Sequence, residues 1–205
     1  ATTEKLVPST LREGAEIPAY ITTPKGYKAD GSFPFVVMIH GHGGNHNEFE
    51  GFDKISNGLA EQGFVVATLD LPGCGKSKES FQLNTMTNMK ADVLDVIDYV
   101  CKNYAVDETR IGAFGYSMGG RITLELLAEG KYSFSTIELV APAEDLTDLK
   151  NLFGGAEKWD TMKAEANEKG YVEFTTKYGQ HQQLSKEWFA DLEKRVEDDI
   201  AVTAL

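Results

Sequence analysis

The stretch that decides the fold of this chain is Arg110-Ile111-Gly112-Ala113-Phe114-Gly115-Tyr116-Ser117-Met118-Gly119-Gly120-Arg121. An apolar strand pattern leads into a serine flanked by glycines, and a helical pattern follows. The spacing Gly115-x-Ser117-x-Gly119 is typical of a tight turn that holds the serine hydroxyl at the carboxyl end of the strand. A helix beginning at Met118 would point its free N–H groups at the same place, which suits a negatively charged intermediate. The alternative is a serine in an ordinary glycine-rich turn.

Strand and helix patterns alternate on both sides of this stretch. Interior strands are expected at residues 35–39, 64–69, 111–116 and 136–141, because runs that are apolar on both faces indicate strands covered by helices on both faces. Helical spacing of apolar residues separates these runs. Residues 17–23 are expected to form an edge strand, since Pro18 cannot donate in the middle of a ladder. The pattern predicts an α/β fold with an open, mainly parallel sheet and flanking helices.

Residues 144–200 have a different character, because they are polar and helix-forming and show no clear interior strand. We interpret them as a helical cap over the carboxyl ends of the strands, and the alternative is a helical subdomain packed elsewhere on the sheet. The predicted organisation is therefore a core at 1–143, a cap at 144–200 and, at 201–205, the start of a link to further strands.

Length, charge and cysteine content limit the classes of partner. The 205 residues carry a net charge of −12, which disfavours nucleic acid and anionic membrane surfaces. No apolar run is long enough to span a bilayer, and the first residues lack the pattern of a signal peptide. Cys74 and Cys101 show no disulfide framework, which favours free thiols and a cytoplasmic protein. A leader removed before Ala1 is the alternative.

A second glycine-rich turn, His40-Gly41-His42-Gly43-Gly44, follows the first interior strand. It is not a dinucleotide fingerprint, because His46 stands where the last glycine is required. His40, His42 and His46 lack a carboxylate or cysteine partner in the sequence, so no metal is expected. Small residues would instead let backbone N–H groups approach a substrate oxygen, with the His42 amide donating alongside that of Met118.

A third turn, at residues 70–77, ends in Gly75-Lys76-Ser77 and imitates a phosphate-binding loop. Asp70 stands where that motif requires glycine, which removes the main support for nucleotide hydrolysis. We therefore expect no cofactor, and interpret Lys76 as a solvated loop charge.

The ordered set of these three turns, each after a strand, resembles the α/β-hydrolase fold family over residues 17–142. Within that family the chain is most similar to small bacterial serine esterases of the cinnamoyl (feruloyl) esterase type, and more distantly to prolyl-oligopeptidase-like peptidases. The resemblance implies that Ser117 is the nucleophile, that the amides of His42 and Met118 form the oxyanion hole, and that the cap roofs the substrate pocket.

The family's catalytic acid and histidine usually follow two later strands, and the sequence ends before either strand appears. Ser117, Asp145 and His181 preserve the family's order of nucleophile, acid and base; alternatively, Asp145 caps a helix and His181 is a surface residue. A serine without a base is a weak nucleophile. The preferred interpretation is a fragment whose open edge beside the fourth strand would aggregate or pair with another chain.

The predicted activity is hydrolysis of carboxylic esters through Ser117, with a small aromatic or acyl ester as the substrate. The missing acid and histidine are expected to impair it in this chain. Two alternatives stay open: a peptidase with the same chemistry, and a non-catalytic protein that binds a small ligand under the cap.

Overall fold

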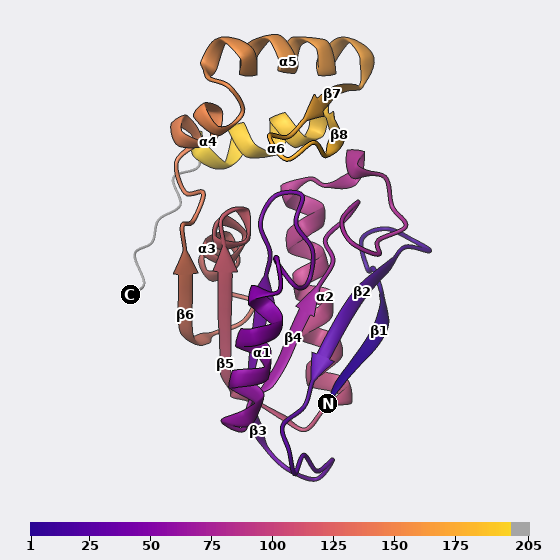
Figure 1. The fold of residues 1–205 in the computed structure, drawn as a ribbon, viewed down its shortest axis with the longest axis vertical. Coiled ribbons are helices and arrows are strands. Elements are labelled where there is room, and N and C mark those ends of the chain that lie inside the picture. Colours follow the sequence, from indigo (N-terminus) through magenta and orange to yellow (C-terminus); the bar gives the residue numbers. More distant parts are fainter. Residues whose placement is uncertain (198–205) are drawn as a thin grey trace.

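The computed structural model describes residues 1–197, and its main feature is a six-stranded sheet (Figure 1). The antiparallel strands β1 and β2 begin the sheet, and the parallel strands β4, β3, β5 and β6 complete it. In that order the bounds are Thr2–Pro8, Glu16–Thr22, Val65–Leu69, Phe33–Ile39, Val106–Tyr116 and Phe134–Val140. The four predicted strands are therefore present, in a mainly parallel sheet. The expected link at 201–205 and cap residues 198–200 lie outside the described residues.

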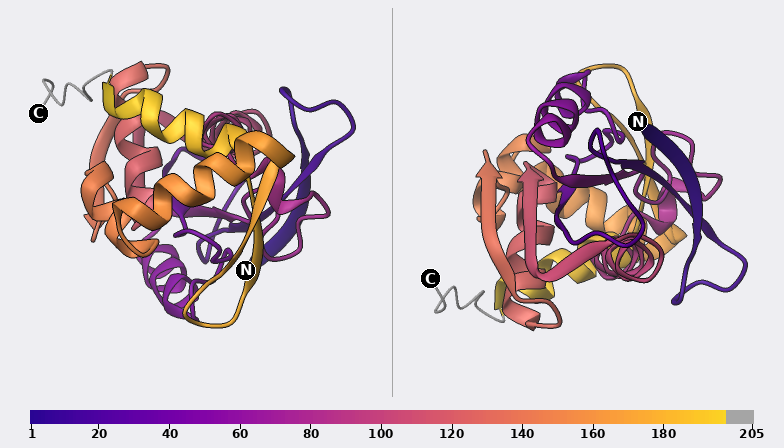
Figure 2. Two further views of the ribbon diagram at one scale, coloured as in Figure 1. Left: turned by 90° about the horizontal axis from the view of Figure 1, so that it is seen from above. Right: turned by 90° about the horizontal axis from the view of Figure 1, so that it is seen from below.

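Helices cover both faces of the sheet (Figures 1 and 2). Helix α1 (Gly51–Glu61) lies on one face, while α2 (Met86–Asn103) and α3 (Met118–Glu129) lie on the other. Alternate residues of β3 explain this division, since Val36 and Met38 pack on the α1 side while Phe35, Val37 and Ile39 join the larger core. A strand that is buried on both faces reads as a continuous apolar run, as the sequence indicated.

The predicted edge position of residues 17–23 is wrong, because β1 lies outside β2 and forms that edge of the sheet. Pro18 is tolerated inside the sheet for a local reason. Its carbonyl accepts from the Asp70 amide at 2.9 Å, and the pairing of β2 with β4 begins only at Ala19 opposite Leu69. The missing N–H of Pro18 therefore falls at the end of a ladder, where no donor is required.

The opposite edge of the described sheet is β6, which pairs only with β5 among residues 1–197. Its exposed positions are Ser135, Thr136, Glu138 and Val140. The fourth predicted strand is therefore only partly covered within the described residues.

The segment after β6 lies beyond the carboxyl ends of the parallel strands, and α5 and α6 cross over the core in the view from above (Figures 1 and 2). It contains α4 (Leu146–Leu152), α5 (Ala156–Lys169), β7 (Tyr171–Thr175), β8 (His181–Ser185) and α6 (Lys186–Glu197). Its interior is built from Trp159, Leu184, Trp188 and Phe189. The segment is thus not purely helical, because an antiparallel β7–β8 hairpin stands between α5 and α6.

A short 3-10 turn, η1 (Phe81–Leu83), connects β4 to α2 and lies against β8 of the cap. In residues 1–197, none of the helices combines the length and apolar character needed to cross a membrane.

Candidate active site

Ser117 lies in a strained turn between β5 and α3. Its backbone has φ 52° and ψ −116°, a conformation that residues other than glycine rarely adopt. The turn is fixed to the end of β6, because the Ser117 amide donates to the Val140 carbonyl at 2.9 Å and the Ala143 amide donates to the Ser117 carbonyl at 3.0 Å. These hydrogen bonds hold the backbone in the strained conformation.

The glycines around Ser117 are required by space. A Cβ at Gly119 would lie 2.0 Å from the Ile39 carbonyl oxygen, and one at Gly115 would lie 2.5 Å from the Gly119 carbonyl oxygen. Both neighbours are backbone atoms and cannot turn aside. The Gly-x-Ser-x-Gly spacing therefore reflects close packing of α3 against β3 and β5, which favours a nucleophile turn over an ordinary glycine-rich one.

Loop 40–44 lies directly beside Ser117, since a Cβ at Gly41 would be 3.3 Å from the Ser117 Cβ. Within residues 1–197, the amides of His42 and Met118 donate to no other group, and the Ser117 hydroxyl has no hydrogen-bond partner. Two uncommitted amides on the segments that flank a half-buried serine are what an oxyanion hole requires.

His40 joins loop 40–44 to the turn after β4. Its Nδ1–H donates to the Gly41 carbonyl at 2.7 Å, and its Nε2 accepts from the Leu71 amide at 3.1 Å. The ring is buried, and burial lowers the pKa of His40 to about 4. A neutral His40 thus ties two of the glycine-rich turns together.

The His42 side chain points into the cap. Its Nε2–H donates to Oε1 of Gln182 on β8 at 2.7 Å, and the ring packs against Phe81, Phe153 and Trp188. Burial lowers the pKa of His42 to about 4. Sequence reasoning assigned a role only to the backbone of His42, because Gln182 stands 140 residues later in the chain.

Asp70, which stands where a phosphate loop would need glycine, organises the turn after β4. Its carboxylate accepts from the Tyr20 hydroxyl at 2.8 Å, from the amide and Nδ1 of His46 at 2.8 and 3.0 Å, and from the Lys76 amide at 3.0 Å. Burial opposes ionisation, but these hydrogen bonds outweigh it and lower the pKa of Asp70. Gly75 must lack a side chain, because a Cβ there would lie 2.3 Å from the Asp70 carboxyl group.

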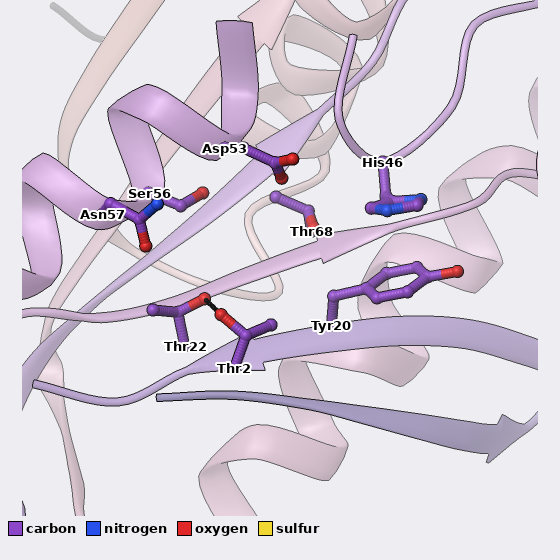
Figure 3. A pocket seen from close by; sticks show the side chains of 8 residues that line it. All are labelled: Thr2, Tyr20, Thr22, His46, Asp53, Ser56, Asn57 and Thr68. Carbon is purple, nitrogen blue, oxygen red and sulfur yellow. Dashed lines mark hydrogen bonds between the residues drawn. The ribbon is translucent and has the colours of Figure 1, made fainter. Parts of the chain in front are cut away.

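A polar hollow of about 310 Å³ lies on the face of the sheet that α1 covers (Figure 3). His46 stacks on Tyr20 at its wall, with ring centroids 3.5 Å apart. The lining residues are Thr2, Tyr20, Thr22, His46, Asp53, Ser56, Asn57 and Thr68. Ser117 does not line this hollow, so it is separate from the candidate nucleophile.

The predicted acid and base lie in the cap. Asp145 caps α4, with its Oδ1 accepting from the Thr147 amide at 2.6 Å. His181 is exposed at the start of β8, where its Nδ1 lies 3.0 Å from the Thr175 hydroxyl. No hydrogen bond in the described part of the chain joins either residue to Ser117. The structure therefore gives both side chains other partners, and their catalytic roles stay predictions.

Each of the four histidines has a hydrogen-bond partner other than Ser117. Across residues 1–197, no group of three or more His, Cys, Asp or Glu side chains is arranged to hold a metal ion.

Glu48 contacts the candidate site and was not identified from the sequence. Its Oε2 accepts from the Gly41 amide at 2.9 Å, and burial raises the pKa of this carboxyl group. Glu48, Phe49 and Glu50 all have positive φ values, which no residue type in the sequence predicted.

A family model described as alpha/beta hydrolase fold matches residues 34–195. Among curated proteins, the chain is similar to the esterase FrsA of Shigella boydii and of Citrobacter koseri, at 28% and 29% identity over 127 residues. The match covers 58% of this chain and 29% of those proteins. The chain thus spans less than a third of the length of these curated relatives.

Solved structures show the same fold. Est1E from Butyrivibrio proteoclasticus with bound ferulic acid has a TM-score of 0.74 at 23% identity, covering 95% of this chain and 72% of that chain. The esterase EaEST from Exiguobacterium antarcticum has a TM-score of 0.55 at 24% identity, covering 82% and 57%.

Proposed function

We propose that this chain, which belongs to the α/β-hydrolase fold family, is a serine hydrolase that acts on carboxylic esters through Ser117. The predicted fold and family resemblance are confirmed, and the similar curated proteins are esterases at low identity. One observation carries the assignment to Ser117. Its strained turn stands between two segments whose amides, at His42 and Met118, are uncommitted within residues 1–197.

The proposed reaction is acyl transfer. The Ser117 oxygen attacks the ester carbonyl carbon, and the carbonyl oxygen becomes an oxyanion that accepts hydrogen bonds from the His42 and Met118 amides. The C–O bond to the alcohol then breaks, and the alcohol leaves with a proton. Water attacks the acyl-enzyme and releases the acid and a free Ser117 hydroxyl. Each oxyanion donor contributes about 2.7–4 kcal/mol to such a step.

The proposed reaction needs a base that accepts the Ser117 proton. His40, His42, His46 and His181 all have other partners, so no imidazole accepts the Ser117 proton within the described residues. Enzymes that lose a triad member retain roughly 10³–10⁴-fold acceleration over water from the oxyanion hole and binding. We therefore expect slow acyl transfer by this chain. Asp145 and His181 would act as acid and base only if the cap brought them to Ser117.

The proposed substrate is a small ester with an aromatic or acyl group. The aromatic side chains of the cap give this little support, because Phe153, Trp159, Trp188 and Phe189 are buried and pack on one another. The ferulic acid in the similar Est1E structure gives the proposed substrate class more support, since ferulic acid is an aromatic acid. Aryl esters of aromatic acids are therefore the first substrates to test.

Labelling with a fluorophosphonate tests the proposal, because phosphonylation needs the same nucleophile and oxyanion hole. We expect slow modification of the parent chain on Ser117, detected by mass spectrometry, and none of Ser117→Ala. Ser32→Ala, in the exposed loop before β3, is the matched control and should label like the parent. A folded parent chain that labels no faster than Ser117→Ala would favour the non-catalytic alternative.

Ester and amide substrates separate the esterase from the peptidase alternative. We expect turnover of an aryl ester and none of a peptide anilide with the same acyl group. Faster cleavage of the anilide would contradict the assignment of the substrate class.

A further inference from the structure

We infer that Gln182, on β8 of the cap, is a positioning residue that holds the His42 amide in place for the oxyanion. This inference rests on the proposed function of Ser117. It assigns to the cap hairpin a part in the chemical step, in addition to covering the site.

The hydrogen bond between Gln182 and His42 has a defined direction. The Gln182 side-chain nitrogen donates to Oε1 of Gln180 at 3.1 Å, which leaves Oε1 of Gln182 facing His42. The His42 Nε2 therefore carries the proton and donates it at 2.7 Å. Gln182 is only 1% exposed, so water does not compete for this bond. Leaving a buried donor without its acceptor costs about 1–3 kcal/mol. Separation of the His42 side chain from β8 is therefore unfavourable.

Three aromatic rings hold the imidazole from the sides. Phe81 in η1, Phe153 at the end of α4 and Trp188 in α6 lie with centroids 5.2–5.7 Å from that of His42. The Nδ1 atom of His42 is buried and has no hydrogen-bond partner in residues 1–197. An apolar ring would fill this space without an unsatisfied nitrogen, so packing alone does not explain a histidine here.

The β7–β8 hairpin also packs closely against the backbone of loop 40–44. A Cβ at Gly43, which has φ 67°, would lie 2.5 Å from Oε1 of Gln180 and 2.5 Å from Nε2 of Gln182. On its other side, the same loop lies against Ser117 at Gly41. The His42 amide is therefore held between the nucleophile and the cap, and a shift of the hairpin moves it. A misplacement of about 1 Å in such a site reduces the rate by roughly 100-fold.

Three substitutions separate positioning from general docking of the cap. Gln182→Met keeps the length of the side chain and removes the acceptor, whereas Gln182→Glu keeps an acceptor oxygen for His42. Gln183→Met is the matched control, because Gln183 accepts from the Gln82 side chain of the core at 2.7 Å and, among the described residues, makes no hydrogen bond with loop 40–44. Both methionine variants thus lose one hydrogen bond of the same length between cap and core.

The first readout is the rate of Ser117 phosphonylation, together with kcat and KM for an aryl ester. We expect Gln182→Met to lower the labelling rate and kcat by about 10- to 100-fold with little change in KM. Gln182→Glu keeps the acceptor for His42 but loses the donor to Gln180, so it should restore only part of the loss. Gln183→Met should stay within about twofold of the parent. Equal losses in both methionine variants, or none in Gln182→Met, would overturn the inference.

The second readout does not depend on activity. In ¹H–¹⁵N NMR spectra, we expect Gln182→Met to shift or broaden the resonance of the His42 backbone amide, while Gln183→Met leaves that resonance where the parent has it. An unchanged His42 amide overturns the inference whatever Ser117 does. If the parent fails to label but the His42 amide responds as expected, the proposed function fails and the positioning by Gln182 stands.

Discussion

The replacement Gly119→Ala tests how tightly the Ser117 turn is packed. The added Cβ would lie 2.0 Å from the Ile39 carbonyl oxygen, 2.6 Å from the Ile39 carbonyl carbon and 2.7 Å from the His40 carbonyl oxygen. All three are backbone atoms, so no side-chain rotation relieves the contact. The first turn of α3 must therefore move away from the end of β3 by about 1 Å or more.

The change in the free energy of unfolding follows from two opposing effects. Overpacking in a close-packed interior costs about 1–3 kcal/mol, and a backbone collision lies at the upper end of that range. Alanine in place of glycine within a helix recovers about 1 kcal/mol. We therefore expect the free energy of unfolding to fall by about 2 kcal/mol. The same shift carries the Met118 amide away from the His42 amide, which should lower phosphonylation of Ser117 by about 100-fold.

Urea unfolding of the parent, Gly119→Ala and Gly58→Ala measures this effect. Gly58 lies within α1 with no atom within 4 Å of an added Cβ, so it undergoes the same chemical change without a collision. With a slope of about 2 kcal/mol per molar urea, the midpoint should fall by about 1 M in Gly119→Ala. It should rise slightly in Gly58→Ala. A Gly119→Ala midpoint equal to that of the parent would refute the argument from packing.

Two further predictions concern pH. Because burial lowers the pKa of His40 and His42 to about 4, the unfolded chain takes up these protons first, and stability should fall as pH decreases from about 6.5 to 4. The fall should reach at most about 3 kcal/mol per histidine. The urea midpoint should therefore decrease less steeply with falling pH in His40→Gln than in the parent. An equal pH dependence in both would contradict a lowered pKa of His40. Burial also raises the pKa of Asp92, which is paired with Arg12, to about 7. Arg12 also pairs with Glu79 at 2.6 Å, so Arg12→Met should destabilise the fold at both pH values. The loss should be about 3 kcal/mol at pH 8 and smaller at pH 5, where Asp92 is protonated and does not need the pair. Arg110→Met, at an exposed ion pair, should behave like the parent at both pH values.

Sequence patterns predicted an element correctly where the physical cause lies within that segment. The four apolar runs became parallel strands, since only a strand covered on both faces tolerates so many apolar residues in succession. The glycines around Ser117 predicted the turn, and the structure supplies the cause in the carbonyl groups that stand where side chains would be.

Prediction failed where a segment depends on its neighbour. Strand β1 is mostly exposed and lacks an apolar run, so its pairing with β2 was not predicted. The β7–β8 hairpin was also missed, because its strands are short and polar and their burial depends on the aromatic interior of the cap.

By itself, the sequence determined the parallel core and the position of Ser117, because apolar runs and required glycines act over a few residues. Tertiary structure alone decided what the histidines do. His40 bonds to the turn after β4, His42 to Gln182 in the cap, and His46 to Asp70. These partners come from distant segments, so no local pattern reveals them, and burial then keeps His40 and His42 neutral.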